Sequence, residues 1–243
     1  MVVRVKRRKT EAELLEIEAF IREGILEGRF VPGQRLVEID LMTELGATRS
    51  AVREALRRIA ADGLVQIERN RGASVRKISR KEVSDILDIL DDLSIFAIRK
   101  AISRVRAPRI RKLIEQSRAA SRRFRKDALE HIQAQDYLYE NARFWQSMTD
   151  AADNPTLAEV KFKLQLRLFC IQRQGLVVEP TRKKWIAHHE EILDAILDGD
   201  VQRAVKLVPR ASANVREAIM ALPDVAFASP TASRTGRVRL QEA

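Results

Sequence analysis

The chain has 243 residues, 45% of them apolar, which is enough for the cores of two domains. No apolar run approaches the roughly 18 residues of a membrane span, and no apolar stretch follows the basic start MVVRVKRRKT. We therefore expect neither a membrane protein nor a secreted protein, but a cytoplasmic one. The formal net charge of +11 indicates a polyanionic partner.

The N-terminal part is expected to hold an arm and then a helix. Residues 1–9 are predicted to form a flexible basic arm. A helix is expected over about 11–28, with Thr10 and Glu13 forming a capping box at its start. It opens a predicted DNA-binding domain over residues 10–77, for the reasons given next.

Residues 33–75 contain two short amphipathic helices joined by Gly46 and followed by a short β-hairpin closed by Arg71-Gly72. This order is typical of a winged helix-turn-helix, which places its second helix in the DNA major groove. The first helix is expected to bury Leu36, Leu41, Met42 and Leu45. The second has one apolar face, formed by Val52, Ala55, Leu56 and Ile59. The predicted strands are 64–67 and 73–75.

Thr48 is placed to cap the second helix, because its hydroxyl can accept a backbone N–H of the first turn. Arg49, Ser50, Arg53 and Arg57 lie off the apolar face. A planar guanidinium can bind guanine or a phosphate through two hydrogen bonds, so these side chains are candidates for DNA contact. The alternative is a basic helix whose charges are merely solvated.

Three motifs resemble the GntR family of bacterial transcription regulators. They are VPGQRL at 31–36, RSAVREALRR at 49–58 and DGLV at 62–65, and the hairpin Arg71-Gly72 follows them. The resemblance covers about residues 11–77. It implies that the DNA contacts are made by Arg35, Thr48, Arg49, Ser50, Arg53, Arg71 and Gly72.

The rest of the chain is predicted to be helical. Residues 78–222 read as an all-α domain of six or seven helices, and the tail 223–243 is expected to be disordered. The whole is thus a mainly α protein with a small β-hairpin wing. Residues 99–126 hold 12 Lys and Arg against one acidic residue, Glu115. They form either a solvated basic face or a surface for phosphates or an acidic partner.

The helical domain resembles the ligand-binding domain of the FadR-like subgroup of this family, through NARFWQSMTDAADNPTL at 141–157 and HEEILDAILDGD at 189–200. Many members of that subgroup bind a divalent metal through an Asp and three His residues. The corresponding positions here are Asn141, Trp145, His189 and Ala211. Only a histidine remains, and one imidazole does not hold such an ion, so we expect no metal and no other cofactor.

A ligand cavity is still predicted near Asn141, Trp145 and His189. Their amide, indole and imidazole groups offer hydrogen-bond donors to a small organic anion. Arg143 and Arg167 are the candidate counter-charges, unless both are exposed at the surface. His189 is either part of such a site or a hydrogen-bonded core histidine.

Three functions remain as hypotheses from the sequence. The first is a transcription regulator, which family resemblance implies is a repressor. It is expected to bind double-stranded DNA as a homodimer at a two-fold symmetric operator and to respond to a small organic acid. The second is a constitutive or architectural DNA-binding protein without an effector. The third, an enzyme, is disfavoured because the sequence shows no nucleophile–base set and no phosphate-binding Gly loop.

Overall fold

The computed structural model describes residues 2–127, 134–175 and 179–229. Its first part is a winged helix-turn-helix. The elements are α1 (Val2–Glu27), β1 (Arg35–Leu36), α2 (Glu38–Leu45), α3 (Arg49–Ala61), β2 (Val65–Glu68) and β3 (Gly72–Val75). The strands form one antiparallel sheet in the order β1-β3-β2, in which Arg35 pairs with Ser74 and Gln66 with the same residue from the other side.

The apolar face of α3 forms the core of this module, as its spacing predicted. Val52, Ala55 and Ile59 are fully buried against α1, whose Ile17, Ile21 and Ile25 repeat every four residues. Leu36 is buried as predicted, but it lies on β1 rather than on the first of the two short helices.

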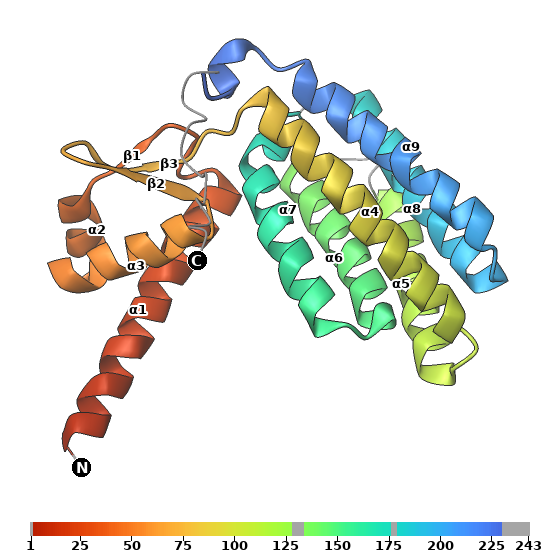
Figure 1. Cartoon of the computed structure of the whole chain (residues 1–243), viewed down its shortest axis with the longest axis horizontal. Helices are drawn as coiled ribbons and strands as arrows, with labels where there is room; N and C mark the ends of the chain where they lie inside the picture. The colour runs from red at the N-terminus through yellow and green to blue at the C-terminus, as the bar shows by residue number, and fades with distance from the viewer. Residues whose placement is uncertain (1, 128–133, 176–178, 230–243) are drawn as a thin grey trace, which may run out of the picture.

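The second part is a bundle of helices. In the described residues these are α4 (Arg80–Arg104), α5 (Pro108–Asp127), α6 (Ala134–Ala152), α7 (Pro155–Gly175), α8 (Glu179–Asp198) and α9 (Val201–Met220). Ser79 caps α4 by accepting the Glu82 amide at 3.1 Å, as expected from the sequence. The predicted fold class, a winged helix-turn-helix followed by an all-α bundle, is confirmed (Figure 1).

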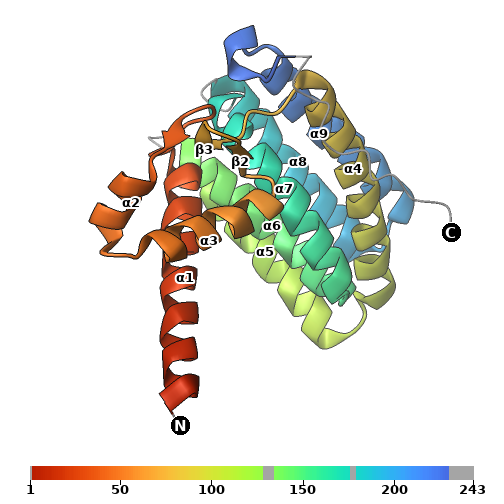
Figure 2. The same ribbon diagram turned by 60° about the vertical axis from the view of Figure 1, so that its left-hand side comes forward.

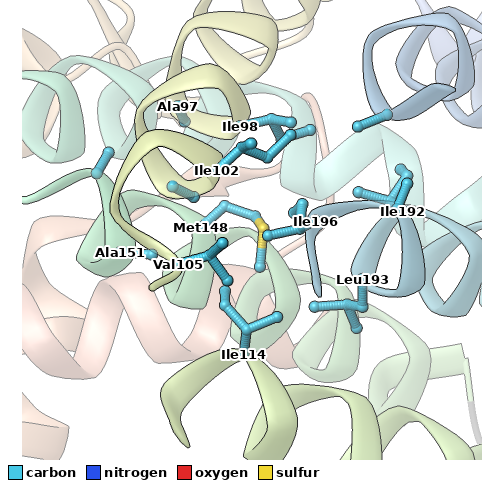
Figure 3. Packing of buried hydrophobic residues seen from close by; sticks show 14 of the residues in the cluster. Ala97, Ile98, Ile102, Val105, Ile114, Met148, Ala151, Ile192, Leu193 and Ile196 are labelled. Atoms are coloured by element: carbon cyan, nitrogen blue, oxygen red, sulfur yellow. The ribbon is translucent and has the colours of Figure 1, made fainter. Parts of the chain in front are cut away.

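The bundle core lies where α4, α5, α6 and α8 meet. Figure 3 shows Met148 of α6 surrounded by isoleucines from the other three helices: Ile98, Ile102, Ile114 and Ile196. All five side chains are buried, and close packing of this kind fixes how the helices lie against one another. None of the helices in the described part of the chain combines the length and apolarity that crossing a bilayer requires.

The structure differs from the sequence-based expectation at both ends of the chain. Residues 2–9 of the expected flexible arm are instead the first part of α1, which runs beyond the winged module (Figure 2). Thr10 therefore lies inside α1 and not at its start. Of the expected disordered tail, residues 223–229 lie against the bundle, where a short 3-10 helix (Asp224–Ala226) precedes the buried Phe227. The remainder of that tail lies outside the described residues.

The basic segment 99–126 covers the end of α4 and most of α5. Carboxylates of α8 neutralise part of it, because Arg118 and Arg122 contact Asp194 and Arg125 contacts Glu190 at 3.0 Å. This pairing favours a partly neutralised surface over a uniformly basic one.

Candidate nucleic-acid interface and interior pocket

The start of α3 is held by a cap that also orders its polar side chains. Thr48 has extended backbone geometry, and its hydroxyl accepts the Ala51 amide at 3.3 Å. The same hydroxyl lies 3.2 Å from that of Ser50. Both residues are exposed, so the first turn of α3 presents two hydroxyls and the positive end of the helix dipole to solvent.

Two arginines extend from this turn and share one carboxylate. The Nε atoms of Arg49 and Arg53 lie 3.9 Å and 3.5 Å from the oxygens of Glu38, at the start of α2. Both guanidinium groups remain more than half exposed. Exposed ion pairs contribute little to stability, so the effect of Glu38 is to orient the two arginines side by side.

The wing supplies the remaining basic groups. Arg71 at its tip is 82% exposed and lies 3.4 Å from Glu68. Gly72 has a φ of +81°, a conformation that side chains rarely adopt, and the Arg35 guanidinium passes 3.8 Å from the place a Cβ would take. Between α3 and the wing is an open cleft of about 340 Å³, whose basic lining residues are Arg53, Arg57 and Arg69.

The structure thus brings the seven predicted DNA-contact residues to one side of the winged module. Sequence reasoning missed Glu38, which lies eleven residues before Arg49 and is brought to it only by the packing of α2 against α3. Ion pairs tie the opposite side of α3 to α1: Arg58 contacts Glu11 at 2.8 Å, and Arg22 contacts Asp62. These contacts set the direction in which α3 presents its arginines.

A pocket opens inside the helical bundle between α4, α6, α7 and α9. Its cavity volume is about 70 Å³, and it is partly open to solvent. Asn141 and Trp145 line it from one face of α6, as their spacing of four residues predicted. The remaining lining is mostly apolar, with polar groups on α4, α7 and α9: Asp91, Ser94, Gln165 and Ser212.

A buried lysine stands behind this pocket, and sequence reasoning did not single it out. Lys161 of α7 is only 2% exposed. Its Nζ donates to the Ser94 hydroxyl at 2.7 Å and lies 4.5 Å from the centre of the Trp145 ring. Burial lowers the pKa of this ammonium to about 7, although the negative charge of Asp91 opposes that change.

Asp91 of α4 lies in the wall of this pocket. It accepts a hydrogen bond from Ser212 of α9 at 2.6 Å. Burial raises the pKa of this carboxyl above its ordinary value, and the hydrogen bond from Ser212 and the charge of Arg216 act in the other direction.

The structure does not bring the other three predicted effector residues to this pocket. His189 is buried beside Phe144, with the two rings stacked at 3.9 Å, and burial lowers its pKa to about 3. Arg143 turns toward α5 and pairs with Glu140. Arg167 reaches the winged module, where its Nε lies 2.9 Å from the place a Cβ on Gly63 would take.

One segment of the bundle contacts the winged module, and another contacts the linker between the two parts. Leu166 of α7 is buried in the apolar core of that module, next to Arg167. The linker at the start of α4 is held by the segment after α9. There Arg80 donates to the carbonyls of Met220 and Leu222 at 2.6 and 2.7 Å, and the Ala228 amide donates to the carbonyl of Ile78.

Comparison with known families matches both parts of this chain. Residues 14–75 match the model of the bacterial regulatory proteins of the gntR family, and residues 85–211 match the FCD domain. The second match alone covers more than half of the chain. The chain belongs to the GntR family.

Relatives of this GntR regulator are themselves transcription regulators. The HTH-type transcriptional repressor RspR of Escherichia coli is 29% identical over 63% of this chain and 65% of its own length. The regulator YdhC of Bacillus subtilis is 33% identical over 34% of this chain and 37% of its own. The chain therefore spans less than two thirds of the length of each of these relatives.

Solved structures share the fold of this regulator. A GntR regulator from Rhodococcus sp. RHA1 aligns with a TM-score of 0.71 at 18% identity, over 87% of this chain and all of that one. The McbR/YncC protein of E. coli aligns with a TM-score of 0.65 at 17% identity, over 84% and 97% of the two chains. At these identities the likeness concerns the fold alone.

The FCD domain of this regulator does not fit the metal site that family resemblance implies. Asn141, Trp145 and Ala211 all line the pocket, and they offer an amide, an indole and a methyl group where ligands would be needed. His189 is stacked on Phe144 instead of facing them. Within residues 2–127, 134–175 and 179–229, no group of three or more His, Cys, Asp or Glu side chains is arranged to hold a metal ion.

Proposed function

We propose that this regulator is a cytoplasmic repressor that binds a two-fold symmetric DNA operator as a homodimer and responds to a small organic acid in its FCD domain. The observation that carries the DNA-binding part is the exposed start of α3, where Arg49 and Arg53 stand side by side on Glu38. In the major groove these guanidinium groups bind base edges. Thr48, Ser50, Arg35, Arg71 and Gly72 contact the adjoining backbone.

The proposal of a homodimer is supported by an apolar stripe on α4. Ile89 and Phe96 lie seven residues apart on one face of this helix, and both side chains remain more than 40% exposed. Large apolar side chains that share an exposed face are typical of a contact with another protein, here a second copy of the chain. Two tethered winged modules make the second DNA contact intramolecular, which raises the affinity for a two-fold site.

The proposal of an effector is supported by the pocket and by the position of α7, which contacts both the pocket and the winged module. Gln165 and Phe169 line the pocket, while Leu166 and Arg167 on the same helix contact the winged module. A ligand that shifts α7 by a fraction of a turn would change the position of the winged module in the dimer. An effector acts in this way only if it binds the two arrangements with different affinity.

A constitutive DNA-binding protein is the alternative, and it predicts a bundle interior filled by side chains. The open space beside Asn141 and Trp145 favours the effector-responsive form. Repression rather than activation is proposed because RspR is named a transcriptional repressor.

The DNA-binding proposal is tested by selecting duplexes from a random pool with the full chain, and by measuring affinity for the selected duplex with fluorescence anisotropy. Arg53→Ala should weaken binding to that duplex by about 1–3 kcal/mol and reduce the preference over random DNA. Arg111→Ala is the matched control, since Arg111 is an equally exposed arginine on α5, and it should leave both values unchanged. Equal affinity of the wild type and Arg53→Ala for selected and random DNA would overturn the assignment of α3.

A further inference from the structure

Lys161 is a buried cation with neutral direct contacts. Its ammonium touches the Ser94 hydroxyl and the Trp145 ring, and in the described part of the chain Asp91 acts on it only from a distance. Burying a charge away from water without an ion-pair partner lowers the free energy of unfolding. Such an unpaired buried cation indicates a site at which a bound anion supplies the partner charge.

The two groups that Lys161 contacts both face the pocket. Ser94 and Trp145 line the cavity, so the ammonium stands directly behind its wall. Ser94 accepts the hydrogen bond from Lys161, which leaves its own proton able to donate into the cavity. The pair thus offers a hydroxyl donor backed by a positive charge, which is what a carboxylate binds.

We propose that the pocket between α4, α6, α7 and α9 binds a small monocarboxylic acid, whose carboxylate lies at Ser94 with Lys161 as its counter-charge. This inference rests on the proposed effector function and names the chemical class of the effector. The apolar part of the acid lies along a wall formed by Leu87, Leu90, Leu138, Phe169 and Val215. The depressed pKa of Lys161 agrees with a cation that lacks an anion in the absence of ligand.

Asp91 limits the ligand to a single carboxylate. It lines the same cavity, and Ser212 already donates to it. A second carboxylate on the ligand would meet this acidic side chain, and like charges in a poorly solvated pocket repel strongly. A hydroxyl on the ligand would be accepted here or at Asn141, whose Oδ1 is buried without a hydrogen-bond partner.

The test is isothermal titration calorimetry of the full chain with straight-chain monocarboxylates from acetate to octanoate. Adipate, hexylammonium and hexanol serve as the dianionic, cationic and neutral counterparts of hexanoate. Lys161→Met removes the charge. Lys163→Met is the matched control, since Lys163 lies on the same helix, is exposed and pairs with Glu159 at 2.6 Å.

At least one monocarboxylate should bind the wild type and Lys163→Met equally and bind Lys161→Met at least about tenfold more weakly. The counterpart molecules of the same chain length should also bind the wild type at least about tenfold more weakly. Equal binding to Lys161→Met would show that Lys161 is not the counter-charge. Equal binding of adipate would overturn the role given to Asp91.

Absence of binding by the whole series at millimolar concentration would overturn the site itself. Anisotropy of the same preparations with the selected duplex separates this result from a failure of the proposed function. Tight DNA binding without acid binding rejects only the pocket, whereas loss of both rejects the regulator proposal as well.

Discussion

Replacing Lys161 with Met should stabilise the protein, and the gain should depend on pH. The side chains have similar length, so the variant keeps the packing of α7 while it removes a buried charge. Burial lowers the pKa of Lys161 from its ordinary 10.5 to about 7. Since one pKa unit corresponds to about 1.4 kcal/mol, a fall of this size amounts to roughly 3–5 kcal/mol of folding free energy at neutral pH.

The direction of the pH dependence follows from the protons bound in each state. Between pH 7 and 10.5 the unfolded chain keeps the lysine protonated while the folded chain releases the proton. The stability of the wild type therefore rises with pH in this window, by at most about 1.4 kcal/mol per pH unit from this group. The advantage of Lys161→Met should be full below pH 7 and should shrink as the pH rises toward 10.5.

Urea unfolding followed by circular dichroism at a series of pH values measures this difference. The Lys163→Met control should stay within about 0.5 kcal/mol of the wild type, because Lys163 is exposed. A Lys161→Met variant that is less stable than the wild type at pH 7, or whose advantage does not change with pH, would refute the reasoning that Lys161 is an unpaired buried cation.

Further predictions concern the dimer, the contact between the two domains and the orientation of α3. Phe96→Asp should give a monomer by light scattering and lower the affinity for the selected duplex by about tenfold or more. Val225→Asp is the control, at an apolar position that lies outside the stripe and is more exposed than Phe96, and it should remain dimeric. A dimeric Phe96→Asp variant would reject the α4 interface. Leu166→Ala should lower the free energy of unfolding by about 2–5 kcal/mol, because it removes a buried side chain. It should also reduce the effect of bound acid on DNA affinity, and an unchanged acid response would contradict the role of α7. Glu38→Gln removes a negative charge near the phosphates together with the group that orients Arg49. It should therefore raise the affinity for random DNA more than the affinity for the selected duplex. An equal gain on both kinds of DNA would argue against orientation by Glu38.

The winged module could be predicted because its signals are local. The apolar face of α3, its Thr48 cap and the glycine turns each lie within a few residues of the structure that they specify. The strand β1 was not predicted, since two residues carry no periodicity and form a strand only by pairing with β3. The sequence does not predict the helical start of α1 either, because a run of basic residues is typical of a flexible arm and is equally compatible with a helix.

Only part of the pocket could be predicted, because only some of its residues are related by a local pattern. Asn141 and Trp145 share a face of one helix, and their pairing follows from spacing. Asp91 and Ser212 come from helices far apart in the chain, so no local pattern joins them. A signal for Lys161 does exist, because it takes an apolar position in the repeat of Leu157, Lys161, Leu164 and Leu168.

The arginines show the converse error. Arg143 lies three residues after Glu140, a spacing that brings opposite charges together on a helix and predicts the ion pair that the structure contains. Reading it as a counter-charge for a ligand ignored this nearer partner. Arg167 lies next to Leu166, and both are directed to the winged module by a contact between domains that sequence periodicity does not encode.

Hydroxyl-radical footprinting of the selected duplex tests the central claim most directly, namely that two copies of the chain read DNA through α3 and the wing. The account predicts two protected regions related by two-fold symmetry, with centres about one helical turn, roughly 10 base pairs, or a multiple of it apart. Arg53→Ala should lose protection in both regions together. A single protected region, or a footprint that Arg53→Ala leaves unchanged, would contradict the account.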